Sequence, residues 1–156
     1  MSKKIKRNPR SLGRKWALQY LYQSDIAKLE FQEEEFALFI EQIENAPSAP
    51  NEHESNKGFA FAREIIQGVL DKVKEIDAYI TEEAKNWKID RMATTDRNVL
   101  RIAVFELMEI KSNHPVVIVN EAVELAKTFG NSDSFKFVNG IGDTLARKLR
   151  PEEMEK

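Results

Sequence analysis

The 156-residue sequence contains no cysteine, two histidines, six glycines and five prolines. The lack of cysteine excludes disulfides, thiolate nucleophiles and cysteine-ligated metal centres, and it fits a reducing compartment such as the cytoplasm. No apolar run approaches the roughly 18 residues of a membrane-spanning helix, and the basic N-terminus lacks the apolar core of a secretory signal. We therefore expect a cytoplasmic protein, with 42% apolar residues that suffice for one domain with a substantial core.

The few histidines and glycines leave little material for a catalytic or cofactor site. His53 and His114 stand alone in predicted loops, without the HExxH spacing of zinc enzymes. The glycines form neither the GxGxxG nor the GxxxxGK phosphate-binding pattern, and no GxSxG motif occurs. Acid pairs such as Glu121 and Glu124 are typical of a solvated helix face. We therefore predict no catalytic residue, no metal and no cofactor.

Charge is distributed unevenly along the chain, although the net charge is only −2. Seven of the 24 Lys and Arg residues precede the first acidic residue, Asp25, whereas the rest of the chain holds 17 basic and all 26 acidic residues. A basic arm at residues 1–9 points to a polyanionic partner, and the acidic body suits a basic protein partner. The alternative is an ordinary lysine-rich terminus without function.

Apolar residues recur at helical spacing along most of the chain, which predicts an all-α fold. Four β-branched residues at 116–119 favour a strand by propensity. No second strand candidate exists to pair with them, so we expect a buried helical entry there. We expect a helical domain at 10–150, a surface loop at 46–56 and a C-terminal tail at 151–156. The expected helices are 10–27, 33–43, one marked by Phe59 through Val73, one capped by Asp77 and running through Trp87, 95–110, one ending at Gly130, and one starting near Asp133.

The segment from Asn120 to Gly140 is the most informative part of the chain. Gly130 is expected to end a helix in the left-handed conformation, and Ser132, Asp133 and Ser134 are candidate N-caps of the next helix.

Phe135, Lys136 and Phe137 follow these caps, two aromatic residues on either side of a cation. Phe137 lies about 100° from the apolar face centred on Val138. We therefore predict a partly exposed ring beside a cation, a combination that binds nucleic acid by stacking and phosphate contact. The alternative is a ring at the edge of the core.

Arg7, Arg10 and Arg14 are spaced by three and four residues, so a helix continued into the arm would align them as one phosphate-contacting stripe. The alternative is an ordinary basic end of the first helix.

Several segments in order between Arg10 and Leu149 resemble the NusB family of bacterial transcription antitermination factors. They are RKWALQYLY (14–22), DRNVLRIAVFEL (96–107), NEAVELAKTFG (120–130) and KFVNG (136–140). Two departures from the family pattern are Ser11 and Leu12, which interrupt the basic arm, and Gly142, which replaces an aliphatic residue and is expected to loosen the last helix.

The resemblance implies an all-helical fold of two small bundles in one compact domain. It implies binding of the single-stranded boxA element of ribosomal RNA operon leader transcripts together with NusE, a ribosomal protein of the small subunit, and entry into an antitermination complex with RNA polymerase and other Nus factors. The RNA-facing residues would be Arg10, Arg14, Lys136 and Phe137 with Asp133 at the rim, and the NusE-facing residues would be Tyr22, Ile26, Asp90 and Asp96.

Two other functions compete with this one. A helical protein-interaction module with only non-specific RNA binding would bind NusE without preferring boxA. An enzyme would resemble RNA methyltransferases that carry an appended domain of this type, but no cofactor-binding loop occurs in this sequence.

Overall fold

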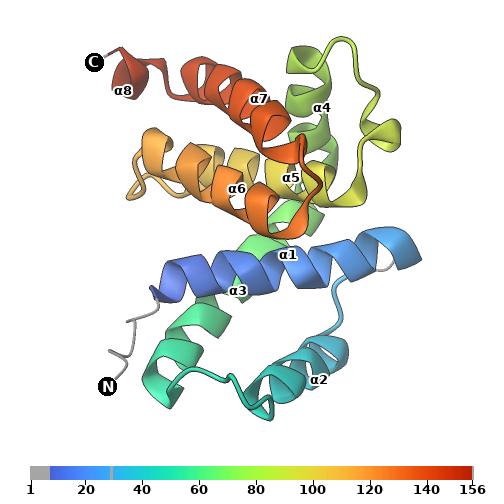
Figure 1. Cartoon of the computed structure of the whole chain (residues 1–156), viewed down its shortest axis with the longest axis vertical. Coiled ribbons are helices and arrows are strands. Elements are labelled where there is room, and N and C mark those ends of the chain that lie inside the picture. The colour runs from blue at the N-terminus through green and yellow to red at the C-terminus, as the bar shows by residue number, and fades with distance from the viewer. Residues whose placement is uncertain (1–7, 29, 156) are drawn as a thin grey trace. The chain divides into compact units, whose positions relative to one another are not determined.

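The computed structural model describes residues 8–28 and 30–155, and all regular structure in these ranges is helical (Figure 1). An all-α fold is therefore confirmed. No helix in the described ranges is long and apolar enough to span a membrane. The elements are α1 (Pro9–Ala27), α2 (Glu33–Glu44), α3 (Glu52–Asp71), α4 (Val73–Glu83), the 3-10 helix η1 (Ile89–Arg91), α5 (Thr94–Glu109), α6 (Pro115–Phe129), α7 (Ser134–Leu149) and α8 (Pro151–Met154).

The chain divides into two compact units, one ending at Gln67 and the other beginning at Gly68. The boundary lies within α3, so this helix contributes most of its length to the first unit and its last turn to the second. Each unit therefore has its own set of packed helices.

In the first unit, local sequence fixes where α1 begins. The side chain of Asn8 accepts a hydrogen bond from the backbone N–H of Arg10 at 2.8 Å, and Pro9 occupies the first helical position. Both features are favourable at a helix start, because an N-cap oxygen satisfies a free N–H and proline has none to satisfy. The last two residues of the arm expected at residues 1–9 therefore form the N-cap and the first residue of α1.

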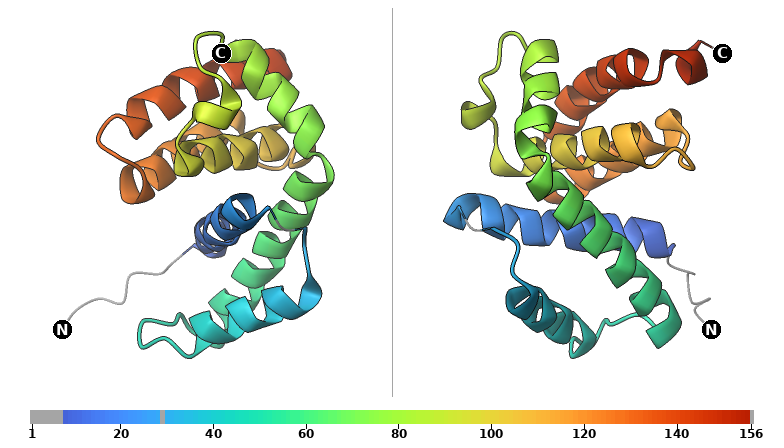
Figure 2. Two further views of the ribbon diagram at one scale, coloured as in Figure 1. Left: turned by 90° about the vertical axis from the view of Figure 1, so that its right-hand side faces the viewer. Right: turned by 180° about the vertical axis from the view of Figure 1, so that it is seen from behind.

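Two glycines allow α1 and α3 to approach closely (Figure 2). A Cβ on Gly13 would lie 2.8 Å from the backbone oxygen of Gly58, and a Cβ on Gly58 would lie 2.5 Å from the Trp16 ring. Trp16 in turn stacks on Phe59 with ring centroids 4.4 Å apart. A larger residue at Gly58 would displace the Trp16 ring, and one at Gly13 would meet the Gly58 backbone and Phe61.

In the second unit, α5 is the central helix, as its sequence predicts. Its apolar residues on every side are buried, among them Val99, Leu100, Val104 and Leu107. Helices α6 and α7 pack against each other and against α5, and α4 packs on both α5 and α7. A helix that is apolar nearly all round has to be covered in this way.

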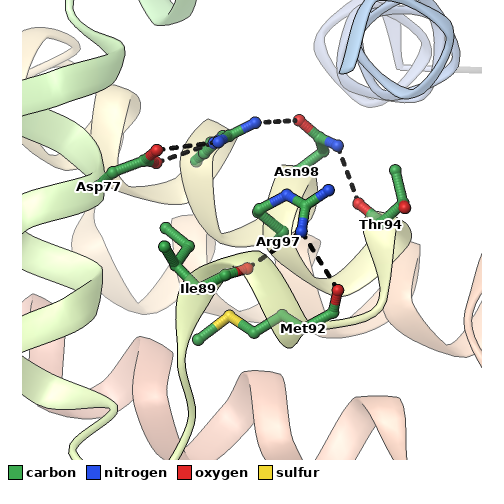
Figure 3. Close-up of polar contacts among 7 residues, drawn as sticks. Asp77, Ile89, Met92, Thr94, Arg97 and Asn98 are labelled. Atoms are coloured by element: carbon green, nitrogen blue, oxygen red, sulfur yellow. Dashed lines mark hydrogen bonds and ion pairs between the residues drawn. The ribbon is translucent and has the colours of Figure 1, made fainter. Parts of the chain in front are cut away.

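A polar network joins α4 to the start of α5 (Figure 3). Arg101 donates from Nε and Nη2 to the two carboxylate oxygens of Asp77, both at 2.8 Å, and from Nη1 to Asn98 at 3.2 Å. Asn98 donates in turn to the backbone oxygen of Thr94 at 2.8 Å. Because Asp77 lies inside α4 and faces Arg101, the expectation that it caps a helix is wrong: α4 begins at Val73.

The loop expected at 46–56 is shorter than predicted. The Asn51 side chain accepts a hydrogen bond from the Glu54 backbone N–H at 2.9 Å, and α3 begins at Glu52. An asparagine that caps a helix and an asparagine in a loop look alike in sequence, because the same side chain favours both.

The segment at 116–119 is helical, as predicted, but only half of it is buried. Ile118 and Val119 are in the core, whereas Val116 and Val117 are exposed on the first turn of α6. His114 caps this turn by accepting a hydrogen bond from Val116 N–H through Nδ1 at 3.1 Å.

The expected C-terminal tail carries α8, which Arg150 fastens to the rest of the second unit. Arg150 is buried and donates to the backbone oxygens of Ile110 and Lys111 at 3.5 and 3.2 Å. It also holds the Glu153 carboxylate with two hydrogen bonds, at 2.7 and 2.6 Å.

Candidate nucleic-acid interface

Phe137 and Lys136 lie in the first turn of α7, in the second unit. Val138 beside them is fully buried, Phe137 is half-buried and Lys136 is exposed. The Phe137 ring contacts Trp87 edge to face, with centroids 5.7 Å apart and planes 70° from parallel. This turn therefore presents one ring and one cation on its outer side.

The other aromatic residue of the motif, Phe135, is also half-buried, but its ring faces cations of its own unit. The Lys127 and Lys136 ammonium groups lie 5.6 and 5.9 Å from the centroid of its ring. These distances are within the range of cation–π attraction. Phe135 therefore helps to place Lys136 next to Phe137.

In the connection from α6 to α7, the two helix ends lie close together at Gly130, and this residue is not in the left-handed conformation. Gly130 has φ −90° and ψ −173°, an extended conformation, so the expected left-handed cap is wrong. A Cβ at this position would lie 2.4 Å from Ser134 Oγ and 2.7 Å from the Ala126 backbone oxygen. Gly130 is thus required by the nearness of the two helix ends.

Asn131 organises the start of α7. Its Oδ1 accepts hydrogen bonds from the Asp133 backbone N–H at 3.0 Å and from Ser134 Oγ at 3.3 Å. Asp133 occupies the N-cap position, but its side chain makes no capping hydrogen bond. The expected capping role of Asp133 is therefore wrong, and its exposed carboxylate lies at the edge of the Lys136–Phe137 turn.

The predicted arginine stripe lies in the first unit, and the structure describes two of its three members. Arg10 is exposed, whereas Arg14 is only 2% exposed. Both guanidinium groups lie over the Phe61 ring, 5.5 and 5.4 Å from its centroid. Arg7 lies outside the described residues.

Trp87 is a further candidate for contact with nucleic acid. Its spacing from other apolar residues in the sequence predicts that it lies in a helix. It lies beyond the end of α4, in the loop before η1, and 59% of its surface is exposed. The signal that could have revealed it is the sequence Lys85-Asn-Trp-Lys88, which places an aromatic residue between cations.

The residues expected to face NusE are divided between the two units. Tyr22 and Ile26 are exposed one turn apart on α1, in the first unit. Asp90 is exposed on η1, in the second unit. Asp96 is 8% exposed in the first turn of α5, and its Oδ1 accepts no hydrogen bond from the described part of the chain.

Acidic and histidine side chains do not converge on a metal-binding cluster. Across residues 8–28 and 30–155, no group of three or more such side chains could hold an ion. The residues described above can bind a ligand by stacking, charge attraction and apolar contact.

Comparison with known proteins finds a family match over most of the chain. The NusB family model matches residues 11–147. The transcription antitermination protein NusB of Myxococcus xanthus is 44% identical over 144 residues, covering 90% of this chain and 96% of its own, and that of Geotalea daltonii is 43% identical with the same coverage.

Solved structures agree with this match. The NusB structure from T. maritima has a TM-score of 0.77 at 30% identity and covers 97% of this chain and 100% of its own. A crystal structure of the antitermination factors NusB and NusE in complex with dsRNA has a TM-score of 0.74 at 27% identity and covers 90% of this chain and 97% of its own.

Proposed function

Because this chain belongs to the NusB family, we propose that it is a transcription antitermination factor that binds boxA RNA together with NusE. The bound pair then joins RNA polymerase and other Nus factors on ribosomal RNA operon transcripts. The protein acts by binding and contributes no catalytic step. Support for the RNA and NusE partners comes from the related NusB–NusE–dsRNA complex.

The observation that carries the RNA proposal is the half-buried Phe137 ring beside the exposed Lys136. A base that stacks on an aromatic side chain gains about 1–3 kcal/mol, and a neighbouring cation neutralises its phosphate. Val138 on the same turn is fully buried, so the backbone that carries both groups is fixed by the core. Asp133 lies at the rim, where its charge would keep phosphate on the Lys136 side.

Arginines of the first unit are proposed as a separate RNA contact. Arg10 is exposed and would contact a phosphate directly, together with Arg7 of the arm. Arg14 is buried beside the same Phe61 ring and would contribute positive potential rather than a direct contact. Such contacts make affinity depend strongly on salt, because each phosphate that is neutralised releases counterions.

A NusE contact is proposed on each unit separately. Tyr22 and Ile26 offer exposed apolar surface on one helix face, of the kind that forms the centre of protein interfaces. In the second unit, the exposed Asp90 adds negative charge that complements a basic ribosomal protein and speeds its association, and the largely buried Asp96 adds to the negative potential there.

A Phe137→Ala substitution tests the RNA proposal. We expect RNA binding to weaken by about 1–3 kcal/mol, measured by fluorescence anisotropy of a labelled boxA RNA, because the stacking surface is removed. Circular dichroism should show an unchanged helical content, since the ring is not in the centre of the core. Val117→Ala is the matched control, because it removes exposed apolar surface from the same unit without touching the aromatic pair. Equal RNA affinity of the wild type and a folded Phe137→Ala protein would refute the assignment.

The competing function, a protein-interaction module with only non-specific RNA binding, is favoured by one observation. Ile26 is 61% exposed, so apolar surface for a protein partner is present independently of any RNA contact. This function predicts NusE binding that Ile26→Asp abolishes, with equal affinity for boxA and scrambled RNA. A boxA preference in the presence of NusE would exclude it.

A further inference from the structure

A large aromatic side chain is exposed in the loop between α4 and η1. Trp87 has 59% of its surface exposed, and among the aromatic pairs of the described residues its ring meets only Phe137, the candidate base-stacking ring. Exposing tryptophan forgoes hydrophobic stabilisation, since burial of such a ring is one of the larger gains in folding. An exposed ring in this position calls for a functional explanation.

The loop that carries Trp87 is held at both ends. On the α4 side, the Trp87 backbone N–H donates to the Ala84 oxygen at 3.0 Å. On the η1 side, Arg97 donates from Nη1 to the backbone oxygens of Ile89 and Met92 at 3.0 and 3.2 Å (Figure 3). A ring on a loop fixed in this way loses little conformational freedom when a ligand covers it.

In the loop and the turn that carry the two rings, exposed cations outnumber exposed acids. Lys85 and Lys88 are exposed within two residues of Trp87, and Lys136 is exposed next to Phe137. The exposed acids within four residues of either ring in this loop and turn are Asp90 and Asp133. The balance favours a polyanion whose phosphates lie along the lysines while its apolar faces meet the rings.

We propose that Trp87 and Phe137 form a two-ring platform for neighbouring bases of single-stranded RNA, with Lys85 and Lys88 meeting the phosphates on the Trp87 side. This inference rests on the RNA binding proposed above and extends that site from α7 to the α4–η1 loop. Both rings belong to the second unit, so the platform does not depend on the placement of the first.

The angle between the rings limits what can bind. Their planes are 70° from parallel, so two bases stacked on them cannot belong to one continuous stack. Bases of a duplex remain stacked on each other, whereas bases of a single strand can be splayed onto separate aromatic surfaces. The platform therefore selects single-stranded RNA over a duplex of the same sequence.

Intrinsic fluorescence provides a direct readout. The chain has two tryptophans, and Trp16 is 3% exposed and stacked on Phe59, in the first unit. Stacking of a base on Trp87 should quench emission when a short boxA RNA is titrated into the protein. The quenching should disappear in Trp87→Leu, which keeps apolar bulk but removes the ring.

Affinity measurements separate a direct role from mere support of Phe137. By anisotropy with the same labelled RNA, Trp87→Leu should bind about 5- to 30-fold more weakly, and Trp87→Phe should recover most of this affinity, because one base stack is removed and then restored. The weakening should persist when both proteins also carry Phe137→Ala. If Trp87 only positioned Phe137, Trp87→Leu would have no effect in that background, and the proposal would be overturned.

The outcomes separate this inference from the function on which it rests. A wild-type protein that binds no RNA, alone or with NusE, would remove the proposed function itself. Wild-type RNA binding that Trp87→Leu leaves unchanged would overturn only the platform. Loss of NusE binding in Trp87→Leu, with RNA affinity of the protein alone preserved, would mean that the ring docks a protein and would also overturn it.

Discussion

Two glycine-to-alanine substitutions that add the same methyl group are expected to change stability in opposite directions. At Gly68, in the last turn of α3, the new Cβ would lie 2.1 Å from Cε2 and 2.4 Å from Cζ of Phe105. The Phe105 ring is buried in the second unit, so it cannot move aside freely. Overpacking of this kind costs about 3 kcal/mol, and the better helix propensity of alanine offsets about 1 kcal/mol. Gly68→Ala should therefore lower the free energy of unfolding by about 2 kcal/mol.

At Gly140, inside α7, a new Cβ meets no heavy atom within 4 Å. Only the propensity difference remains, so Gly140→Ala should raise the free energy of unfolding by about 1 kcal/mol. The same holds for Gly142, where the Cβ would be in ordinary contact with Val119 at 3.4 Å. The glycine that departs from the family pattern is thus compatible with α7 and lowers its stability only through propensity.

The assay is urea unfolding followed by far-ultraviolet circular dichroism, comparing each variant with the wild type. Adding Phe105→Leu to Gly68→Ala serves as the control, because a smaller side chain frees the space that the methyl group needs. The double variant should be less destabilised than the sum of the two single variants. If Gly68→Ala were as stable as Gly140→Ala, the close packing of Gly68 on Phe105 would be refuted.

Further predictions concern charge. A hydrogen bond from Arg150 holds the pKa of Glu153 below its ordinary value near 4.5. The ion pair therefore stabilises the protein above that pH, and this stabilisation disappears as the pH falls through the lowered pKa. Unfolding curves of the wild type and Glu153→Gln should converge on acidification. Deleting residues 1–7, which spares the Asn8 cap, should reduce the slope of log affinity for RNA against log salt by about 0.7 for each phosphate that the arm neutralises, measured by anisotropy; an unaltered slope would argue against the arm. Asp77→Ala should lower the unfolding free energy, because both hydrogen bonds between the Arg101 guanidinium and the Asp77 carboxylate are lost; unchanged urea midpoints would contradict this.

The parts of the fold that the sequence predicts well are those where apolar spacing is continuous. The central helix α5 and the long α1 lie within one residue of their expected limits, since burial of one face decides both pattern and structure. Helix ends are less predictable where no glycine or proline marks them. Asp77 is as suitable for capping as for an ion pair, and only its position opposite Arg101 determines which role it takes.

In the candidate site too, some features follow from the local sequence and others do not. The angular position of Phe137 on α7 follows from helical geometry, because Val138 and Leu145 face the core. Trp87 was missed because its spacing from Tyr79, Ile80 and Ala84 continues a helical pattern beyond Glu83, where α4 ends. Its contact with Phe137 joins segments that are far apart in the chain, and no local pattern encodes such a pair.

Recognition of boxA RNA together with NusE is the proposed function on which the other RNA-binding predictions depend. The most direct test is fluorescence anisotropy of labelled boxA RNA and a scrambled control, with and without NusE, across a salt series. We expect a preference for boxA that sharpens when NusE is added. Equal, weak and strongly salt-dependent binding of both RNAs, with or without NusE, would contradict it.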